Sequence, residues 1–176
     1  MKLASRFMPE YKPKKGRKFA LFVGGCAFLA VLYFAPVFVV MVAGIALLLF
    51  VWSYFEQPRK DEYFANLYKD RNNLSICNFA KEFDARKIDT WIIRATYEEV
   101  QRIVCCDYLL PIKADDHLFD TLMLDEDDLD LDLVEIISQR TGRSLDQYEN
   151  NPFYGKVTTV RNLVLFFNCQ PESNAI

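Results

Sequence analysis

Seven acidic side chains crowd the stretch 125–135, and carboxylates at this density could bind a cation or a basic partner. They are Asp125, Glu126, Asp127, Asp128, Asp130, Asp132 and Glu135. Calcium is the first chemistry to consider, because Asp128, Asp130 and Asp132 match positions 1, 3 and 5 of an EF-hand loop. Position 6 of that loop should be glycine and is Leu133, and position 12 should be glutamate and is Gln139. The stretch therefore fails as an EF-hand, and a loose acidic site for divalent ions is only a weak alternative.

The pattern of the cysteines and the single histidine predicts neither catalysis nor a metal site. The five cysteines form no CxxC pair and the single histidine is His117, so zinc lacks ligands at the usual spacing. No candidate nucleophile accompanies His117, and the chain has neither a Gly-rich phosphate loop nor a Ser-His-Asp order. An odd, scattered set of cysteines fits reduced thiols in the cytosol better than a disulfide framework. We therefore expect a protein that is not an enzyme and holds no cofactor.

The acidic stretch itself could be a strand or a helix. Asp and Leu alternate over residues 128–133 as in a half-buried strand, but Asp is poor in strands. In a helix, one side would carry Leu129, Leu133, Ile136, Ile137 and Arg140. Asp130 and Leu131 do not fit this pattern, which predicts that the helix begins near them. Asp132 and Glu135 would then form a capping box at its start, and Thr141-Gly142 would end it.

Two further segments predict helices of a soluble domain. The sequence "DTWIIRATYEEVQRIV", residues 89–104, is amphipathic and begins with the plausible N-cap Asp89. The sequence "VTTVRNLVLFFN" predicts a last helix, capped by Thr158 or Thr159. A long loop that contains Pro111 follows the first helix, because proline disfavours a helix interior. The predicted fold class is all-α, with three or four short helices in this domain.

The uncharged run from Phe19 to Phe55 predicts a membrane segment. It has 37 residues, whereas one crossing needs about 20. Pro36 divides it into two predicted helices, 19–34 and 37–54, which form a transmembrane hairpin. Basic residues flank both ends, so both termini should lie on the cytoplasmic side of the inner membrane. A single tilted span with a kink at the proline is the alternative.

The predicted domain organisation follows the distribution of charge. Residues 1–18 form a basic N-terminus of net charge +6, and residues 19–55 form the hairpin. Residues 56–88 form a mixed-charge connector with apolar residues at helical spacing. We expect these residues to pack against the next domain, and the alternatives are that they extend the second span or lie on the bilayer surface. Residues 89–176 form the soluble domain, of net charge −10. The opposite charges of the two ends predict different neighbours for each.

The order of these elements resembles the acyl carrier protein fold. The segment 89–104 looks like its first helix, "LFDTLMLDEDDLDLDLVEIISQRTGRSL" looks like the approach to its acidic second helix, and "GKVTTVRNLVLFFN" looks like its last helix. The resemblance covers about residues 89–169 and implies a carrier-like helical bundle behind the membrane hairpin.

The sequence departs from the family at the position that carries phosphopantetheine. Family members attach this group to a serine at the start of the second helix. Here Glu126 or Asp130 occupies that position, depending on which flanking residues are aligned. Ser138 and Ser144 lie about one helix later. The resemblance therefore implies a carrier-like domain without the prosthetic group.

Two functions stay open at this point, besides the less favoured enzyme. The first is a non-catalytic, membrane-anchored binding module that presents the seven acids to a basic protein partner, and to no nucleic acid. The second is an immunity or inhibitor protein that neutralises a basic bacterial toxin. The sequence makes no prediction of the oligomeric state.

Overall fold

The regular structure of the described residues is entirely helical, which confirms the all-α class. A computed structural model describes residues 4–8, 10–11, 36–104 and 108–173. The chain separates into one unit of Met1–Tyr11 with Asn66–Ile176 and a second unit of Lys12–Ala65. The first predicted leg of the hairpin, residues 19–34, lies outside the described residues.

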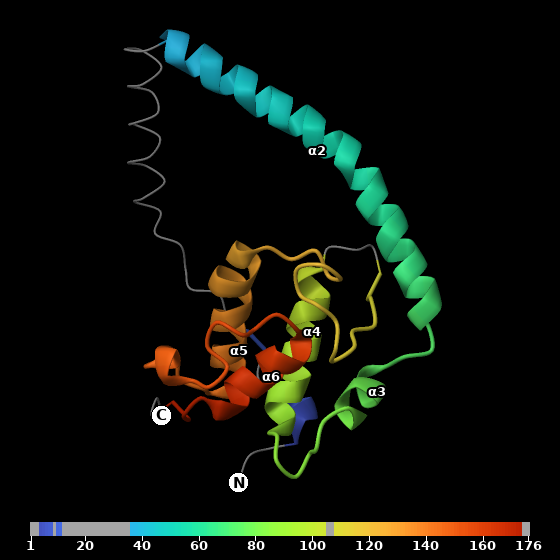
Figure 1. Cartoon of the computed structure of the whole chain (residues 1–176), viewed down its shortest axis with the longest axis vertical. Helices are drawn as coiled ribbons and strands as arrows, with labels where there is room; N and C mark the ends of the chain where they lie inside the picture. The colour runs from blue at the N-terminus through green and yellow to red at the C-terminus, as the bar shows by residue number, and fades with distance from the viewer. Residues whose placement is uncertain (1–3, 9, 12–35, 105–107, 174–176) are drawn as a thin grey trace. The chain divides into compact units, whose positions relative to one another are not determined.

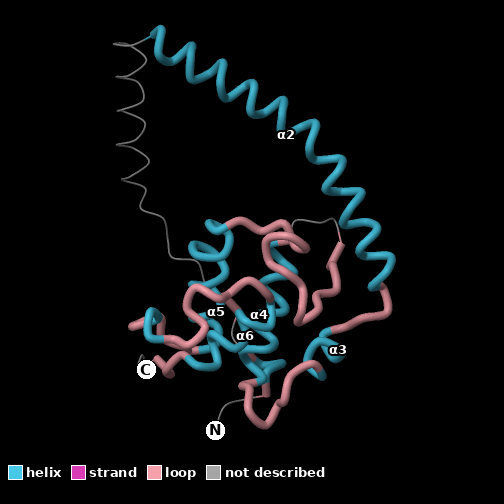
Figure 2. The backbone as a smooth tube through the Cα atoms, viewed as in Figure 1, coloured by secondary structure: helices cyan, strands magenta, loops and turns pink. Residues whose placement is uncertain are grey.

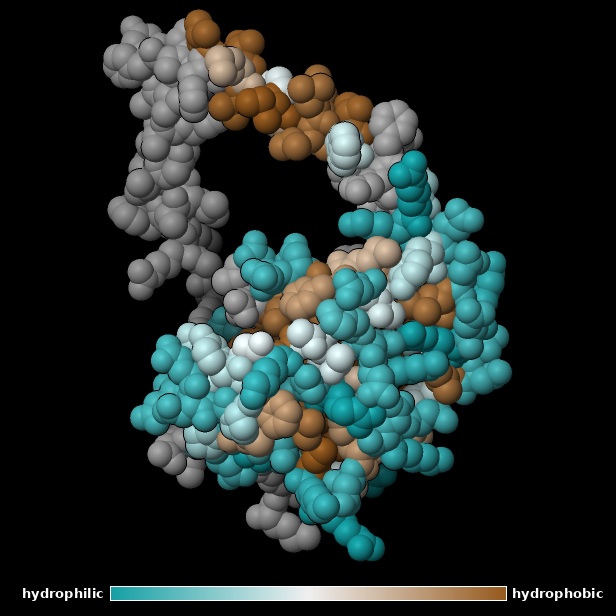
Figure 3. All heavy atoms as spheres, viewed as in Figure 1, coloured by the Kyte–Doolittle hydropathy of each residue, from teal (hydrophilic) through white to brown (hydrophobic). Residues whose placement is uncertain are grey.

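The longest element is α2, Pro36–Arg71, a helix of 36 residues (Figure 1). Pro36 is its first described residue, and the residues before it, where the predicted break would show, lie outside the described ranges. The helix runs past the predicted end at residue 54, includes Pro58 and ends at Arg71, so the first half of the predicted connector continues it. Figure 3 shows apolar side chains in brown along this helix. Those exposed by more than half include Val37, Val40, Met41, Ile45, Leu47, Leu48, Leu49, Phe50 and Trp52. Of the helices within the described residues, none combines the length with the apolarity that a membrane crossing requires.

Helix α4, Thr90–Ile103, is the centre of the other unit and confirms the helix predicted from residues 89–104. Its N-cap is Asp89, whose carboxylate accepts the Trp91 N–H at 2.9 Å. The side chains of Ile92, Ala95 and Val100 are completely buried. Helices α3 (Ile76–Lys81), α5 (Val134–Thr141) and α6 (Val160–Cys169) all pack against α4 (Figure 2).

The predicted ends of the last two helices are confirmed. The Thr159 hydroxyl accepts the Asn162 N–H at 3.2 Å and so caps α6. Gly142 ends α5 in the left-handed conformation, with φ of 67°, and its N–H binds the Ser138 carbonyl at 2.9 Å. Two short 3-10 turns are also present, η1 (Ser5–Phe7) and η3 (Tyr148–Asn150).

The acidic stretch is helical, but it begins earlier than predicted. Residues 126–127 are already helical, and η2, Asp128–Leu133, is a π-helix that leads into α5. The predicted capping box of Asp132 and Glu135 is therefore wrong, because both residues lie inside the continuous helical backbone. The π turn, in which the Val134 N–H binds the Leu129 carbonyl, accommodates the residues that did not fit an α-helical face. Below, the acidic helix means residues 126–141.

A buried ion pair fastens the end of α2 to the loop after α4. The Arg71 guanidinium makes two bonds of 2.7 Å to the Asp116 carboxylate and one of 3.2 Å to the Pro111 carbonyl. The two side chains are only 8% and 5% exposed. The same carboxylate also accepts the Lys113 N–H at 2.8 Å, so it accepts three hydrogen bonds in all from the described residues. Removal of one charge would leave the other buried and uncompensated.

We expect Arg71→Met to lower the free energy of unfolding by about 3–5 kcal/mol, since it strands the Asp116 carboxylate. The double variant Arg71→Met/Asp116→Asn should recover part of this loss, because asparagine still accepts the Lys113 N–H. Lys87→Met is the control, since the Lys87–Asp84 pair is 82% and 48% exposed and should change stability by less than about 1 kcal/mol. Urea unfolding of the full-length protein, followed by Trp91 fluorescence in a Trp52→Phe background, measures all three. Equal losses for Arg71→Met and Lys87→Met would contradict the assignment.

Candidate partner-binding site

The acidic helix is held against α4 by one arginine. Arg140 of α5 forms ion pairs with Glu98 and Glu99 of α4, and its side chain is 8% exposed. Burial alone would lower the pKa of Arg140, but its bonds to Glu98 and Glu99 together outweigh burial and raise that pKa. This arginine stays charged and neutralises two acids of α4.

Two further arginines complete the neutralisation of α4. Arg94 binds Glu98 at 2.7 Å, one turn away, and Arg102 binds Glu99 at 2.6 Å. The side chain of Glu99 is 7% exposed, so these contacts satisfy a carboxylate that is almost out of reach of water. The acids of α4 are thus part of the fold and are not available to a partner.

Two of the seven predicted site residues also serve the fold. The Asp125 N–H donates to the Asp128 carboxylate at 3.1 Å, and the Asp128 N–H donates to the Asp125 carboxylate at 2.8 Å. This reciprocal pair caps the acidic helix, with aspartates in the places that a capping box gives to Ser/Thr and Glu. Each side chain satisfies a backbone donor that the first helical turn leaves without a partner.

The other predicted site residues are spread along the same helix. Glu126, Asp127, Asp132 and Glu135 are exposed, and the side chain of Asp130 lies outside the described residues. The structure therefore places all seven on or at the start of one helix, with at least four of the side chains open to solvent. Among these described side chains, Glu126, Asp127 and Asp132 are exposed and have no capping or ion-pair role.

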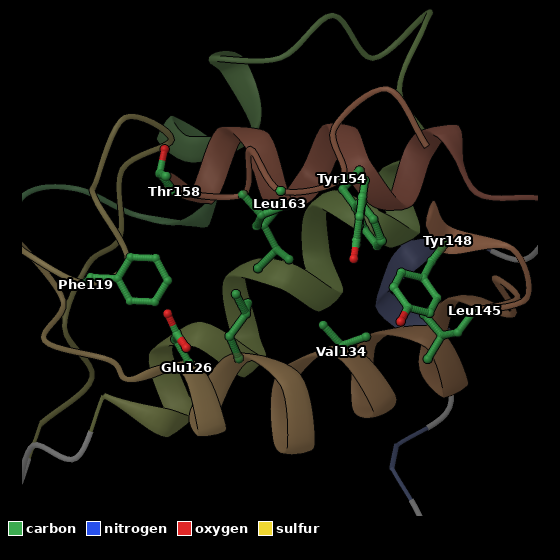
Figure 4. A pocket seen from close by; sticks show the side chains of 12 residues that line it. Phe119, Glu126, Val134, Leu145, Tyr148, Tyr154, Thr158 and Leu163 are labelled. Atoms are coloured by element: carbon green, nitrogen blue, oxygen red, sulfur yellow. The ribbon is translucent and has the colours of Figure 1, made fainter. Parts of the chain in front are cut away.

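A hollow of about 640 Å³ opens beside the acidic helix, and the sequence did not predict it. Figure 4 shows it between the acidic helix and α6, with Phe119 and Glu126 at one end and Leu145 and Tyr148 at the other. Its lining residues are Phe119, Glu126, Leu129, Val134, Leu145, Tyr148, Tyr154, Gly155, Val157, Thr158, Leu163 and Phe166. Much of one wall comes from residues 145–158, a loop without helical or strand periodicity. Tyr148 and Tyr154 were the only residues of this loop that could have indicated a binding site.

Histidine and the cysteines contribute no further site within the described residues. His117 forms a β-bridge with Thr159, and its Nδ1 lies 3.1 Å from the Asp120 carboxylate, so it has a packing role. Cys77 and Cys169 are exposed free thiols. Across the described ranges, no three His, Cys, Asp or Glu side chains come together as metal ligands would.

Comparisons with protein-family models, with curated proteins and with solved structures find no match for this chain. The geometry alone therefore defines the class, which is a small helical bundle with an acidic helix on its surface. The similarity to acyl carrier proteins stays a prediction from the sequence.

Variants of the capping acids and variants of the other exposed acids should differ in their free energy of unfolding. Asp125→Ala and Asp128→Ala each remove a capping bond and should lower the free energy of unfolding by about 0.5–2 kcal/mol. Asp127→Ala and Asp132→Ala should change it by less than about 0.5 kcal/mol, or raise it slightly, because they relieve repulsion between like charges. Urea unfolding of the four single variants measures the difference. A loss for Asp127→Ala as large as that for Asp125→Ala would show that the fold needs both.

Proposed function

We propose that this chain is a non-catalytic, membrane-anchored binding module that presents the acidic helix to a basic protein partner. The observation that carries the proposal is the division among the acids. Glu98 and Glu99 are neutralised by arginines, and Asp125 and Asp128 cap the helix. Asp127 and Asp132 are exposed and, among the described residues, neither cap the helix nor form an ion pair. Like charges this close repel one another, so these two acids cost stability.

Complementary charge suits such a surface to steering a partner. Opposite charges accelerate the encounter of two proteins and select among partners, more than they tighten the final complex. Each exposed pair contributes only about 0.2–1 kcal/mol, so binding would be a sum of several pairs. It would also weaken with salt, because mobile ions screen exposed charges over about 8–10 Å.

The proposed domain type is an acyl-carrier-like bundle without phosphopantetheine. Several features support this likeness, namely the amphipathic α4, the long loop after it, the acidic helix and the threonine cap of α6. Either aligned position for the carrier serine holds an acid, Glu126 or Asp130, and neither can accept the arm through a hydroxyl. We therefore propose recognition through the protein surface and no covalent carriage.

The proposed anchor is the uncharged run 19–55, in the inner membrane, with the helical bundle in the cytoplasm. Its support is the sequence, in which 37 residues without a charge are flanked by basic residues on both sides. Helix α2 adds that the side chains of Val40, Leu48 and Phe50 are each at least 70% exposed. Apolar surface of this extent is unfavourable in water and favourable in lipid.

Charge reversal on the acidic helix tests the proposed function. The double variant Asp127→Lys/Asp132→Lys leaves the caps intact and should slow association with a partner purified from detergent-solubilised membranes. The matched control is Glu10→Lys/Asp70→Lys, which changes the net charge equally through exposed acids outside the acidic helix. Surface plasmon resonance at low and high salt measures the rates. If the two double variants associate at the same rate as the parent at low salt, the acids are only a solvated surface.

The topology of the anchor is tested with reporters fused to the C-terminus. We expect a fluorescent protein to be active there and a reporter that matures only in the periplasm to be inactive, because two crossings return the chain to the cytoplasm. Strong periplasmic activity would replace the hairpin with a single span.

A further inference from the structure

We propose that the hollow beside the acidic helix is an anchor pocket, which receives a bulky apolar side chain from a basic segment of the partner protein. This inference rests on the proposed function and adds to it what the partner must carry. The acids would attract and orient the segment, and the hollow would hold it.

The lining of the hollow favours an apolar occupant. Leu129, Val134 and Leu145 come from the acidic helix and the loop after it, and Leu163 and Phe166 come from α6 (Figure 4). A volume of about 640 Å³ lies within the range of clefts that bind ligands. Apolar walls of this kind gain free energy when water is replaced by apolar groups.

The charge at the hollow requires that the occupant be accompanied by a cation. Glu126 is the only charged residue among those that line it, and it lies in the wall at one end. The exposed Asp127 follows it directly, and Asp132 lies on the same helix. An anionic ligand would therefore be repelled, whereas a lysine or arginine beside the apolar group would be paired.

The extent of the acids favours a protein segment over a small cationic amphiphile. The exposed acids Glu126, Asp127 and Asp132 extend over about 9 Å along the helix at roughly 1.5 Å per residue. One cationic head group could meet Glu126 but would not reach the exposed Asp132 further along the helix. A basic segment of two or three helical turns has the required length, and its charges can match several acids at once.

Two tyrosines at the rim strengthen the assignment. The rings of Tyr148 and Tyr154 stack edge to face with centroids 5.4 Å apart, and the two residues are 44% and 50% exposed. Tyrosine offers a large apolar face with a hydroxyl at its edge, which makes it frequent among the residues that dominate binding energy. Its ring face also attracts an arginine or lysine that approaches the hollow.

Site-specific photo-cross-linking in the full-length protein, within membranes of the native host, tests this inference. The probe p-benzoylphenylalanine replaces Tyr148 at the hollow, Asp132 on the acidic helix, or Lys87 as an exposed control. We expect the first two probes to capture the same protein and the Lys87 probe not to capture it. Mass spectrometry should place the Tyr148 cross-link on a large apolar residue that has lysine or arginine three or four residues away.

Other outcomes separate the two proposals. If the Asp132 probe captures a partner but the Tyr148 probe captures a lipid, a small molecule, a second copy of this chain or nothing, the pocket assignment is wrong and the acidic surface stands. A Tyr148 cross-link on a segment without a basic residue nearby has the same meaning. If neither probe captures a protein above the Lys87 control, the proposed function fails as well.

Discussion

The buried charge of Glu99 constrains this helical bundle more than any other single group. A carboxylate that is 7% exposed must be compensated, and the compensation comes from Arg102 on the same helix and from Arg140, which lies 41 residues further along the chain. The contact with Arg140 joins α4 to the acidic helix. Without it, Glu99 would lose the positive charge that the acidic helix supplies to it. The acidic helix is therefore joined to α4 by ion pairs as well as by buried apolar side chains.

The same constraint determines which acids remain open to solvent. Arg140 lies near the C-terminal end of the acidic helix, and Asp125 with Asp128 secures its N-terminal end. Between these two fixed points the buried side is apolar, with Leu133 and Ile137 completely buried. Asp132 is left on the exposed side, and the hollow lies along the flank that faces α6. The acidic face and the apolar hollow are therefore neighbours for a structural reason.

Sequence patterns within one or two helical turns predicted the helices well. Contacts between residues far apart in the sequence were not predicted. The amphipathic spacing of 89–104, its cap Asp89 and the stop at Gly142 each depend on residues within a turn or two, and the structure confirms all three. The start of the acidic helix was misplaced because alternating Asp and Leu has no α-helical period, so Asp132 resembled a cap better than Asp125 did. The pairs Arg140–Glu99 and Arg71–Asp116 join residues more than 40 positions apart, and no sequence pattern marks them. The hollow depends on the aperiodic loop 145–158, whose path follows from packing and not from propensity.

The π turn at Asp128–Leu133 has a consequence for how this chain should be aligned with any other. A π turn holds one residue more than an α turn, and one residue corresponds to a rotation of roughly 100° about the helix axis. A homologue that lost a single codon within this turn could keep both flanking helical segments in the same orientation, with the same side chains buried. An alignment that forbids a gap there would pair outward-facing acids of one chain with inward-facing residues of the other. Searches for relatives of this helix should therefore allow a one-residue gap between Asp128 and Leu133.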